Sequence, residues 1–479
     1  MISFFVSLVL LILGWIIYGS FVERVFSSSI KRKTPAYMNY DGVDYVPISQ
    51  RKALLIQFLN IAGLGPIFGA IMGAMYGPVV FIWIVIGTIF GGAVHDYFSG
   101  MISLRRHGSS LSEWIGDYLG TNIRAILRVL IVLLMIMVGA VFTSGPAKIL
   151  AGMTGDTIPY VYWAGIILFY YIIATLFPID KIIGRIYPIF GFALLFMAVG
   201  ILASIFISGD FTLIPEIDFT LLNQHPHAER LPLFPMLFIT VACGAISGFH
   251  ATQSPLMSRC MKNEREGRHI FYGAMVLEGI VALIWAAAGT CFYEGTDGLH
   301  GFMAANGNNA AATVADISRG YLGKIGSILA MLGVVAAPIT SADTGFRAAR
   351  LIIADATHTS QRPFSKRLII AIPLSIACFI LLQIDFEVLW RYFAWCNQTL
   401  AVFTLWAITV YLALRNKAYV ITLIPALFMT SISVTYIFIA KEGFSLPTSI
   451  AYPAGVIIPL LLLIIFWRWT KTVNKETKL

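Results

Sequence analysis

The stretch NIAGLGPIFGAIMG, Asn60 to Gly73, places four glycines and one proline inside an apolar run that extends from Ala53 to Met75. A run of about 20 apolar residues crosses a bilayer as one helix, but Pro66 removes a backbone donor and weakens the helix at membrane depth. The freed backbone groups must then find partners in protein, water or a ligand. An interrupted membrane helix of this kind indicates the binding site of a transporter, although glycines that only allow close helix packing give the same pattern.

The composition is that of a membrane protein. Of 479 residues, 58% are hydrophobic and 12% charged, and the mean hydropathy is +0.82. Too few polar residues remain to cover a soluble domain of this length, so we predict a polytopic membrane protein. The net charge of +9 does not indicate a nucleic-acid partner, because the basic residues fall in alternate short loops. The five cysteines stand far apart, and we expect core residues rather than ligands of a metal or cofactor.

The apolar runs predict about thirteen transmembrane helices, numbered here as spans 0 to 12. Their centres lie near Leu11, Leu64, Val85, Leu134, Leu168, Leu195, Cys243, Leu283, Val335, Ser375, Phe403, Pro425 and Pro459. With the N-terminus outside, 27 of the 33 basic residues fall in the inner loops. The positive-inside rule therefore predicts a periplasmic N-terminus and a cytoplasmic C-terminus. The first apolar stretch has no basic residues before it and no small-residue cleavage site, so we expect it to remain as a helix.

A weak internal repeat relates spans that are five apart. Gly69-Ala-Ile-Met-Gly73 in span 1 recurs as Gly244-Ala-Ile-Ser-Gly248 in span 6. An odd offset inverts the second copy in the membrane, as in the LeuT type of repeat. We therefore predict an all-α protein with a LeuT-like 5+5 inverted repeat, one extra N-terminal helix and two extra C-terminal helices. The predicted units are the extra helix (1–22), a cytoplasmic basic loop (23–52), the first repeat (53–208), an extracytoplasmic loop (209–231), the second repeat (232–413), and two helices with a cytoplasmic tail (414–479).

Span 6 concentrates polar side chains between Ser247 and Ser254. Such groups are costly in hydrocarbon unless they face a cavity or one another, so the pattern indicates either bonds between helices or a substrate site. Helix ends at a break offer amides that suit a carboxylate and carbonyls that suit a cation. We predict unwound segments near Ala62 to Pro66 and Ser247 to Gln253 that face each other. The candidate substrate-binding residues are Asn60, Gly63, Gly65, Pro66, Ser247, Gly248, His250 and Gln253.

Titratable residues inside the predicted spans are candidates for ion coupling, because an intramembrane carboxylate is a functional candidate by default. Each also has a structural interpretation: Asp343 could pair with Arg347 four residues later, and His95 could be a neutral, hydrogen-bonded core residue. Hydroxyls beside Pro338 suit either a cation or helix packing. The candidate ion-coupling residues are His95, Asp96, Glu278, Thr340, Ser341 and Asp343, with the choice between proton and sodium left open.

Other motifs narrow the class. His225, His227 and Glu229 in the long outer loop could be metal ligands, but a proline-containing exposed loop is more typical of solvated residues. Arg391 could attract an anionic substrate or pair with a nearby acidic residue. The chain has no GxxxxGK[ST], HExxH or GxSxG motif, so we expect no enzymatic activity and a driving force that comes from an ion gradient or a partner subunit.

Five stretches together are similar to the carbon starvation protein A family of the amino acid–polyamine–organocation superfamily. They are IAGLGPIFGA (Ile61 to Ala70), GGAVHDYFSGMISLRRHGSSLSE (Gly91 to Glu113), CGAISGFH (Cys243 to His250), PITSADTGFRAARLIIAD (Pro338 to Asp355) and LWRYFAWCNQTLAVFTLW (Leu389 to Trp406). The resemblance implies a bacterial inner-membrane uptake system, active in carbon starvation, for peptides and, in some relatives, pyruvate. By this resemblance we expect the chain to be without the additional C-terminal membrane segments of larger members, and span 5 has no lysine, unlike that of proton-coupled superfamily members.

Our leading hypothesis is thus a secondary active importer of peptides or pyruvate-like carboxylates that works by alternating access. The alternative is a membrane-embedded nutrient sensor that transports little. The expected partners are a small-molecule substrate and the lipid bilayer, and the sequence leaves the oligomeric state open.

Overall fold

The computed structural model describes residues 1–42, 44–155, 157–176, 179–361 and 363–476, and these residues are folded into helices and loops. In the first part of the chain the elements, with short 3-10 or π-helical segments marked η, are α1 (Ile2–Leu13), η1 (Gly14–Tyr18), α2 (Gly19–Phe26), α3 (Pro35–Met38), α4 (Gln50–Ile61), η2 (Gly65–Gly69), α5 (Ala70–Ala74), α6 (Val79–Ile86), η3 (Gly87–Gly92), α7 (Ala93–Arg105), α8 (Leu111–Leu119), α9 (Thr121–Met153), α10 (Tyr160–Leu176), α11 (Ile179–Ser208) and η4 (Asp210–Leu213). The remaining elements are α12 (Leu233–Thr240), α13 (Gly248–Ser258), η5 (Glu264–Glu266), η6 (Arg268–Tyr272), α14 (Gly273–Cys291), α15 (Thr296–Ala305), α16 (Ala310–Ala330), η7 (Met331–Val335), α17 (Ala336–Ala356), α18 (Phe364–Leu381), α19 (Phe386–Ala413), α20 (Val420–Ile439) and α21 (Thr448–Glu476).

By length and composition, nine helices in the described part of the chain can cross a membrane, or ten if the bent pair formed by α4 and η2–α5 counts as one span. The three other predicted spans fall on elements that this criterion does not select. They are the 17-residue α10, the divided span of α12 and α13, and α17, in which Asp343, Arg347 and Arg350 are all buried. The structure thus supports a multi-pass helical protein without establishing thirteen spans.

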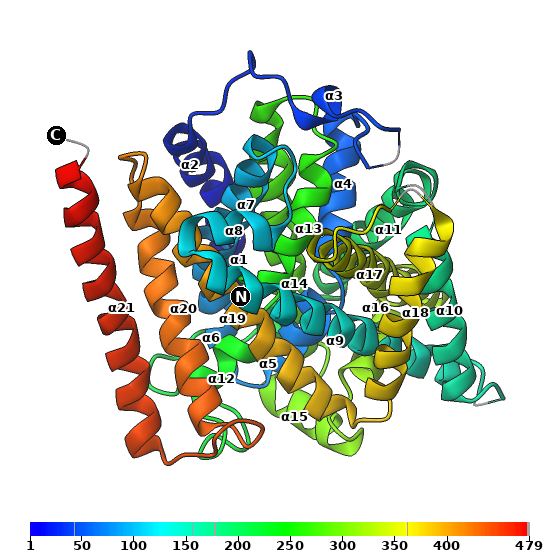
Figure 1. Ribbon diagram of the computed structural model, residues 1–479. Helices are drawn as coiled ribbons and strands as arrows, with labels where there is room; N and C mark the ends of the chain where they lie inside the picture. The colour runs from blue at the N-terminus through cyan, green and yellow to red at the C-terminus, as the bar shows by residue number, and fades with distance from the viewer. Residues whose placement is uncertain (43, 156, 177–178, 362, 477–479) are drawn as a thin grey trace.

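Loops that carry many of the arginines meet on one face of the molecule, which we call the basic face. Buried Glu264 accepts hydrogen bonds from Arg32 and Arg105, and Lys417 donates to the carbonyls of Val25 and Phe26. In Figure 1 this face lies at the top, where α2 and α3 are seen. The first span ends at Phe26 rather than at residue 22, because Phe26 packs against aromatic rings of α7 and so continues the helix.

The opposite face is assembled from the other set of loops. Glu216 accepts hydrogen bonds from the backbone and hydroxyl of Ser3, and Gln224 donates its amide to the Tyr76 carbonyl. α15 lies on this face, at the bottom of Figure 1. The division of the loops between two faces agrees with the alternation that the apolar runs predicted.

The centre of the molecule consists of a small number of helices. Of the most apolar 18 residues in Glu264–Cys291, 89% are buried, and the share in Val79–Arg105 is 83%. The same share is only 28% in Ile2–Phe26 and 22% in Thr448–Thr472. α9 packs along α17 and α19, and α4 contacts α11, α13 and α14. In Figure 1 α21 lies at the edge, beside α20. The helices at the edge expose large apolar side chains, such as Val456 and Ile457 of α21, as expected of a surface that faces lipid.

Candidate functional site

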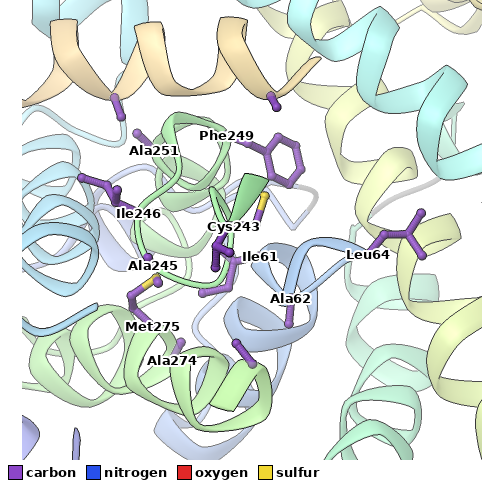
Figure 2. Close-up of a cluster of buried hydrophobic side chains, with 14 of the residues drawn as sticks. Ile61, Ala62, Leu64, Cys243, Ala245, Ile246, Phe249, Ala251, Ala274 and Met275 are labelled. Carbon is purple, nitrogen blue, oxygen red and sulfur yellow. The ribbon is translucent and has the colours of Figure 1, made fainter. Parts of the chain in front are cut away.

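Two broken helices meet at the centre of the bundle. The first is interrupted after Ile61, where α4 and the segment η2–α5 enclose a bend of 59°. The second is interrupted between α12, which ends at Thr240, and α13, which begins at Gly248. Figure 2 shows Ile61 of the first break beside Cys243 of the second, with α14 packed below them. The structure thus brings together the two segments that the sequence placed opposite each other.

The contact between the breaks explains the position of one glycine. A side-chain carbon added to Gly65 would lie 2.0 Å from Cβ of Cys243, and one added to Gly244 would lie 3.8 Å from Cα of Pro66. Gly63 lies against the ring of Phe142 in the same way. Close packing and helix interruption, which the sequence left as alternatives, therefore both occur in this stretch.

The predicted position of the second break was wrong. The unwound segment is 241–247, and the residues from His250 to Gln253 are helical. The helix resumes early because Asn397 Oδ1 on α19 accepts hydrogen bonds from the amide of Phe249, at 2.6 Å, and the hydroxyl of Ser247, at 3.0 Å. A polar oxygen at this position satisfies amides that a helix start leaves unpaired. Gly248 fits here because a side-chain carbon would lie 2.4 Å from the Asn397 carbonyl.

The polar residues of α13 do not unwind the helix, because their hydroxyls are satisfied within it. Thr252 donates to the Phe249 carbonyl and Ser254 to the His250 carbonyl. Asn397 itself was not among the predicted site residues. Its signal was an adjacent pair of amide side chains, Asn397 and Gln398, in the middle of an apolar run.

Four buried titratable side chains form what we call the His–carboxylate cluster: His95 and Asp96 from α7, His250 from α13 and Glu278 from α14. His95 Nδ1 is 2.7 Å from Asp96 Oδ1, and His250 Nδ1 is 2.9 Å from Asp96 Oδ2. The second ring nitrogen of His250, Nε2, is 3.4 Å from Glu278 Oε2. All four side chains are fully shielded from solvent. The sequence assigned His250 to the substrate site, whereas the structure joins it to three of the ion-coupling candidates.

Gaining or losing one proton changes which contacts the His–carboxylate cluster can make. A protonated imidazole donates from both nitrogens, so a charged His250 can bind Asp96 and Glu278 at once, while the neutral ring donates from only one. Buried charges are stable only when paired, so removing or adding one proton changes the balance of attraction among the four groups. Because His250 lies on α13, the second half of a broken helix, this balance is linked to how α13 packs against its neighbours.

Three amide side chains near the breaks have polar atoms with no hydrogen-bond partner among the described residues. Both amide atoms of Asn60 and of Gln57 are buried and unpaired in this sense, as is Oε1 of Gln253. Buried polar atoms are normally satisfied, so these side chains are candidate contacts for a ligand or water. Gln57 was not among the predicted site residues, because its only signal in the sequence was a polar side chain within an apolar run.

The remaining ion-coupling candidates lie on α17. Ser341 donates a 2.9 Å hydrogen bond to the carbonyl of Leu59, in the last turn of α4 before its break, and Thr340 donates to Ala337 in its own helix. Asp343 is fully buried, and Arg347 on the same helix donates to the Ala174 carbonyl. The Ser341 contact ties α17 to the first broken helix, and helix packing is one of the two roles that the sequence had left open.

A cavity of about 810 Å³ opens on the face opposite the basic face and reaches Phe68 in η2 and Thr240 at the end of α12. Its lining includes Lys148, Arg391, Asp385 and the rings of His225, His227 and His300. Burial and the neighbouring histidines lower the pKa of His225 to about 4, so this ring is neutral near pH 7. Arg391 is 3.2 Å from Glu442, a partner that the sequence had not indicated. No group of metal-ligating side chains is present among the described residues.

The broken helices, the buried cluster and the one-sided cavity define the class of protein: a multi-pass helical membrane protein with the fold of secondary transporters. The structure is similar to the Eremococcus coleocola manganese transporter, with a TM-score of 0.52 and 14% identity over 91% of this chain and 99% of that chain. It is also similar to Mhp1, a nucleobase-cation-symport-1 family transporter, with a TM-score of 0.53 and 13% identity over 88% and 92% of the two chains. At these identities the likeness establishes the fold alone.

The chain belongs to the carbon starvation protein CstA family, whose model matches residues 1–160 and 156–321. An uncharacterized membrane protein of Haemophilus influenzae is 43% identical over 64% of this chain and 95% of its own length. The pyruvate/proton symporter BtsT of Escherichia coli is 27% identical, over 57% of this chain and 46% of that protein. The peptide transporter CstA of Campylobacter jejuni is 29% identical, over 57% and 47%. The chain thus matches less than half the length of these two named transporters.

Proposed function

We propose that this chain is a secondary active importer, driven by a proton gradient, of small solutes that carry a carboxylate, such as peptides or pyruvate. The observation that carries the proposal is the buried contact of Asp96 with His250 on a broken helix, at 2.9 Å, with Glu278 on the other side of the same ring. Relatives named for pyruvate/proton symport and peptide transport support this function. A role in carbon starvation is part of the proposal, and the description of the family supports it.

The transport cycle in this proposal is alternating access around the two breaks. Two interrupted helices in corresponding positions support a LeuT-like 5+5 inverted repeat with thirteen spans, in which α4–α5 and α12–α13 are the equivalent helices. Substrate enters the cavity on the face opposite the basic face, whose lining includes Lys148, Asp385 and Arg391. Passage beyond Phe68 and Thr240 then requires the inner halves of the broken helices to move. No cofactor takes part, and the coupling ion is a proton.

The orientation is testable by fusion. We propose that the basic face is cytoplasmic, because 27 of the 33 basic residues fall in the loops assigned to that side. A reporter fused after Leu479 is expected to be active only in the cytoplasm, and one inserted next to Asn308, on the opposite face, only outside. Paired alkaline phosphatase and fluorescent-protein fusions measure this. Both reporters on one side of the membrane would contradict the orientation and the inverted repeat.

Substrate and ion can be identified together in proteoliposomes. Uptake of labelled pyruvate and of labelled di- and tripeptides is measured under separately imposed proton and sodium gradients, with protein-free liposomes as the control. The proposal predicts accumulation of one of these carboxylate solutes above its outside concentration with a proton gradient, and no accumulation with sodium alone. Accumulation with a sodium gradient only would show that the coupling ion is sodium and not a proton. Saturable binding without accumulation would favour the nutrient sensor instead.

A further inference from the structure

A second cavity, of about 500 Å³, lies on the basic face between the end of α2 and the start of η6, away from the two breaks. Its lining consists of Glu23, Arg24, Ser27, Ser28, Arg265, Arg268 and His269. We call it the arginine pocket. Three arginines here face a single carboxylate, and the transport proposal uses none of these groups.

Only one of the three arginines is neutralised. Arg268 Nε is 3.5 Å from Glu23 Oε2, while Glu23 Oε1 accepts a 2.8 Å hydrogen bond from Ser28. Arg24 and Arg265 are exposed and have no acidic partner among the described residues. The pocket therefore keeps the positive charge of two guanidinium groups, each with several donors arranged for a phosphate.

A further polar atom at the pocket lacks a partner. His269 Nδ1 is buried and has no hydrogen-bond partner among the described residues, and the ring of Trp15 packs edge-on against the imidazole. His269 thus adds an imidazole to the polar lining of the pocket.

The surface beside the pocket is apolar and exposed. Ile17 and Phe21 are 64% and 40% exposed, and Phe90 on the neighbouring η3 is 46% exposed and within ring contact of Tyr18. Phe21 and Arg24 stand three residues apart on α2 and so share one side of the helix. The basic residues thus lie where an apolar, lipid-facing helix surface reaches the edge of the bilayer. A ligand with acyl chains uses both surfaces, whereas a free phosphate uses only the pocket.

We propose that the arginine pocket binds the phosphate headgroup of an anionic phospholipid from the adjacent leaflet. Basic pockets between transmembrane helices are suited to such headgroups. The bound lipid bridges α2 and η6, and η6 continues directly into α14, which carries Glu278 of the cluster. The lipid is therefore expected to stabilise the attachment of the first span to the core, whatever the transported solute is.

The test uses the full chain purified in a neutral detergent. Thermal unfolding is measured with phosphatidylglycerol, cardiolipin, phosphatidylcholine or inorganic phosphate, and lipid retention is measured by native mass spectrometry. The two anionic lipids are expected to raise the Tm, whereas phosphatidylcholine and phosphate at the same concentration leave it unchanged. An equal rise with inorganic phosphate would show a free-anion site and overturn the lipid assignment.

Substitutions in the arginine pocket test whether the lipid binds at this site. The pair Arg24→Gln and Arg265→Gln removes both unpaired charges, and lipid affinity is expected to fall about 30-fold, which corresponds to about 1 kcal/mol for each arginine near an anionic surface. Arg51→Gln, at an exposed arginine in the first turn of α4, is the matched control and is expected to retain full affinity. Unchanged affinity in the double variant, or an equal loss in the control, would contradict the proposal. Because both arginines are exposed, the double variant is expected to fold.

Discussion

Asp96→Asn is expected to abolish accumulation of substrate against its gradient while leaving exchange of substrate across the membrane intact. Asparagine keeps the size of the side chain but cannot carry the charge that pairs with His95 and His250, at 2.7 and 2.9 Å. A carrier whose two conformations no longer differ in proton affinity only equilibrates its substrate, so the accumulation ratio should fall to about one. Uptake and counterflow in the same proteoliposomes measure the two activities separately.

The matched control for this variant is Ser99→Ala. Ser99 is buried one turn further along α7, and its hydroxyl donates only to the carbonyl of His95, so its loss should leave coupling unchanged. If Asp96→Asn accumulates substrate normally, with the pH profile of the unaltered protein, the cluster is a structural network and the proton-relay role is wrong.

Gly65→Leu is expected to reduce transport to the level of protein-free liposomes while the protein remains in the membrane. The first carbon of any side chain at this position would lie 2.0 Å from Cβ of Cys243, so the two breaks would be forced apart. Buried segments packed this closely do not accept added volume without a shift of the backbone. Transport assays and quantification of membrane-inserted protein together measure the effect.

Two further variants separate this effect from a general loss of folding. Gly165→Leu on α10 places the same side chain where nothing lies within 4 Å, and it should transport normally. Gly65→Ala should also be inactive. Combining it with Cys243→Gly should restore part of the activity, because the glycine then lies on the other side of the same contact and leaves room for the alanine. Full transport by Gly65→Leu would show that the breaks need not touch, which contradicts the arrangement of the candidate site.

The sequence located one break well and the other poorly, for a physical reason. Near Asn60 to Gly73 the signals are local, since proline and glycine act on the backbone of their own segment. In span 6 the polar side chains of Thr252 and Ser254 suggested unwinding, but their hydroxyls bond within the helix. The true break is set by Asn397, which lies far away in sequence and caps α13 from another helix. No local pattern reveals such a contact.

The sequence identified the residues of the His–carboxylate cluster but not their arrangement. His95, Asp96, Glu278 and His250 were each conspicuous as titratable groups in apolar runs. Three helices bring these residues into one cluster. This arrangement depends on tertiary packing, which cannot be read from a single sequence. The number of spans was uncertain for a related reason, because α17 buries charged residues inside the protein and so is less apolar than a helix that faces lipid.

The central claim is that substrate entry carries protons by way of the His–carboxylate cluster. It is tested most directly by proteoliposomes that contain a pH indicator and receive the transported substrate from outside, with no gradient of protons or sodium imposed. The account predicts a saturable acidification of the interior that accompanies uptake of labelled substrate, is abolished by a protonophore, and is absent with Asp96→Asn. Substrate uptake without acidification, or acidification that persists unchanged in Asp96→Asn, would contradict it.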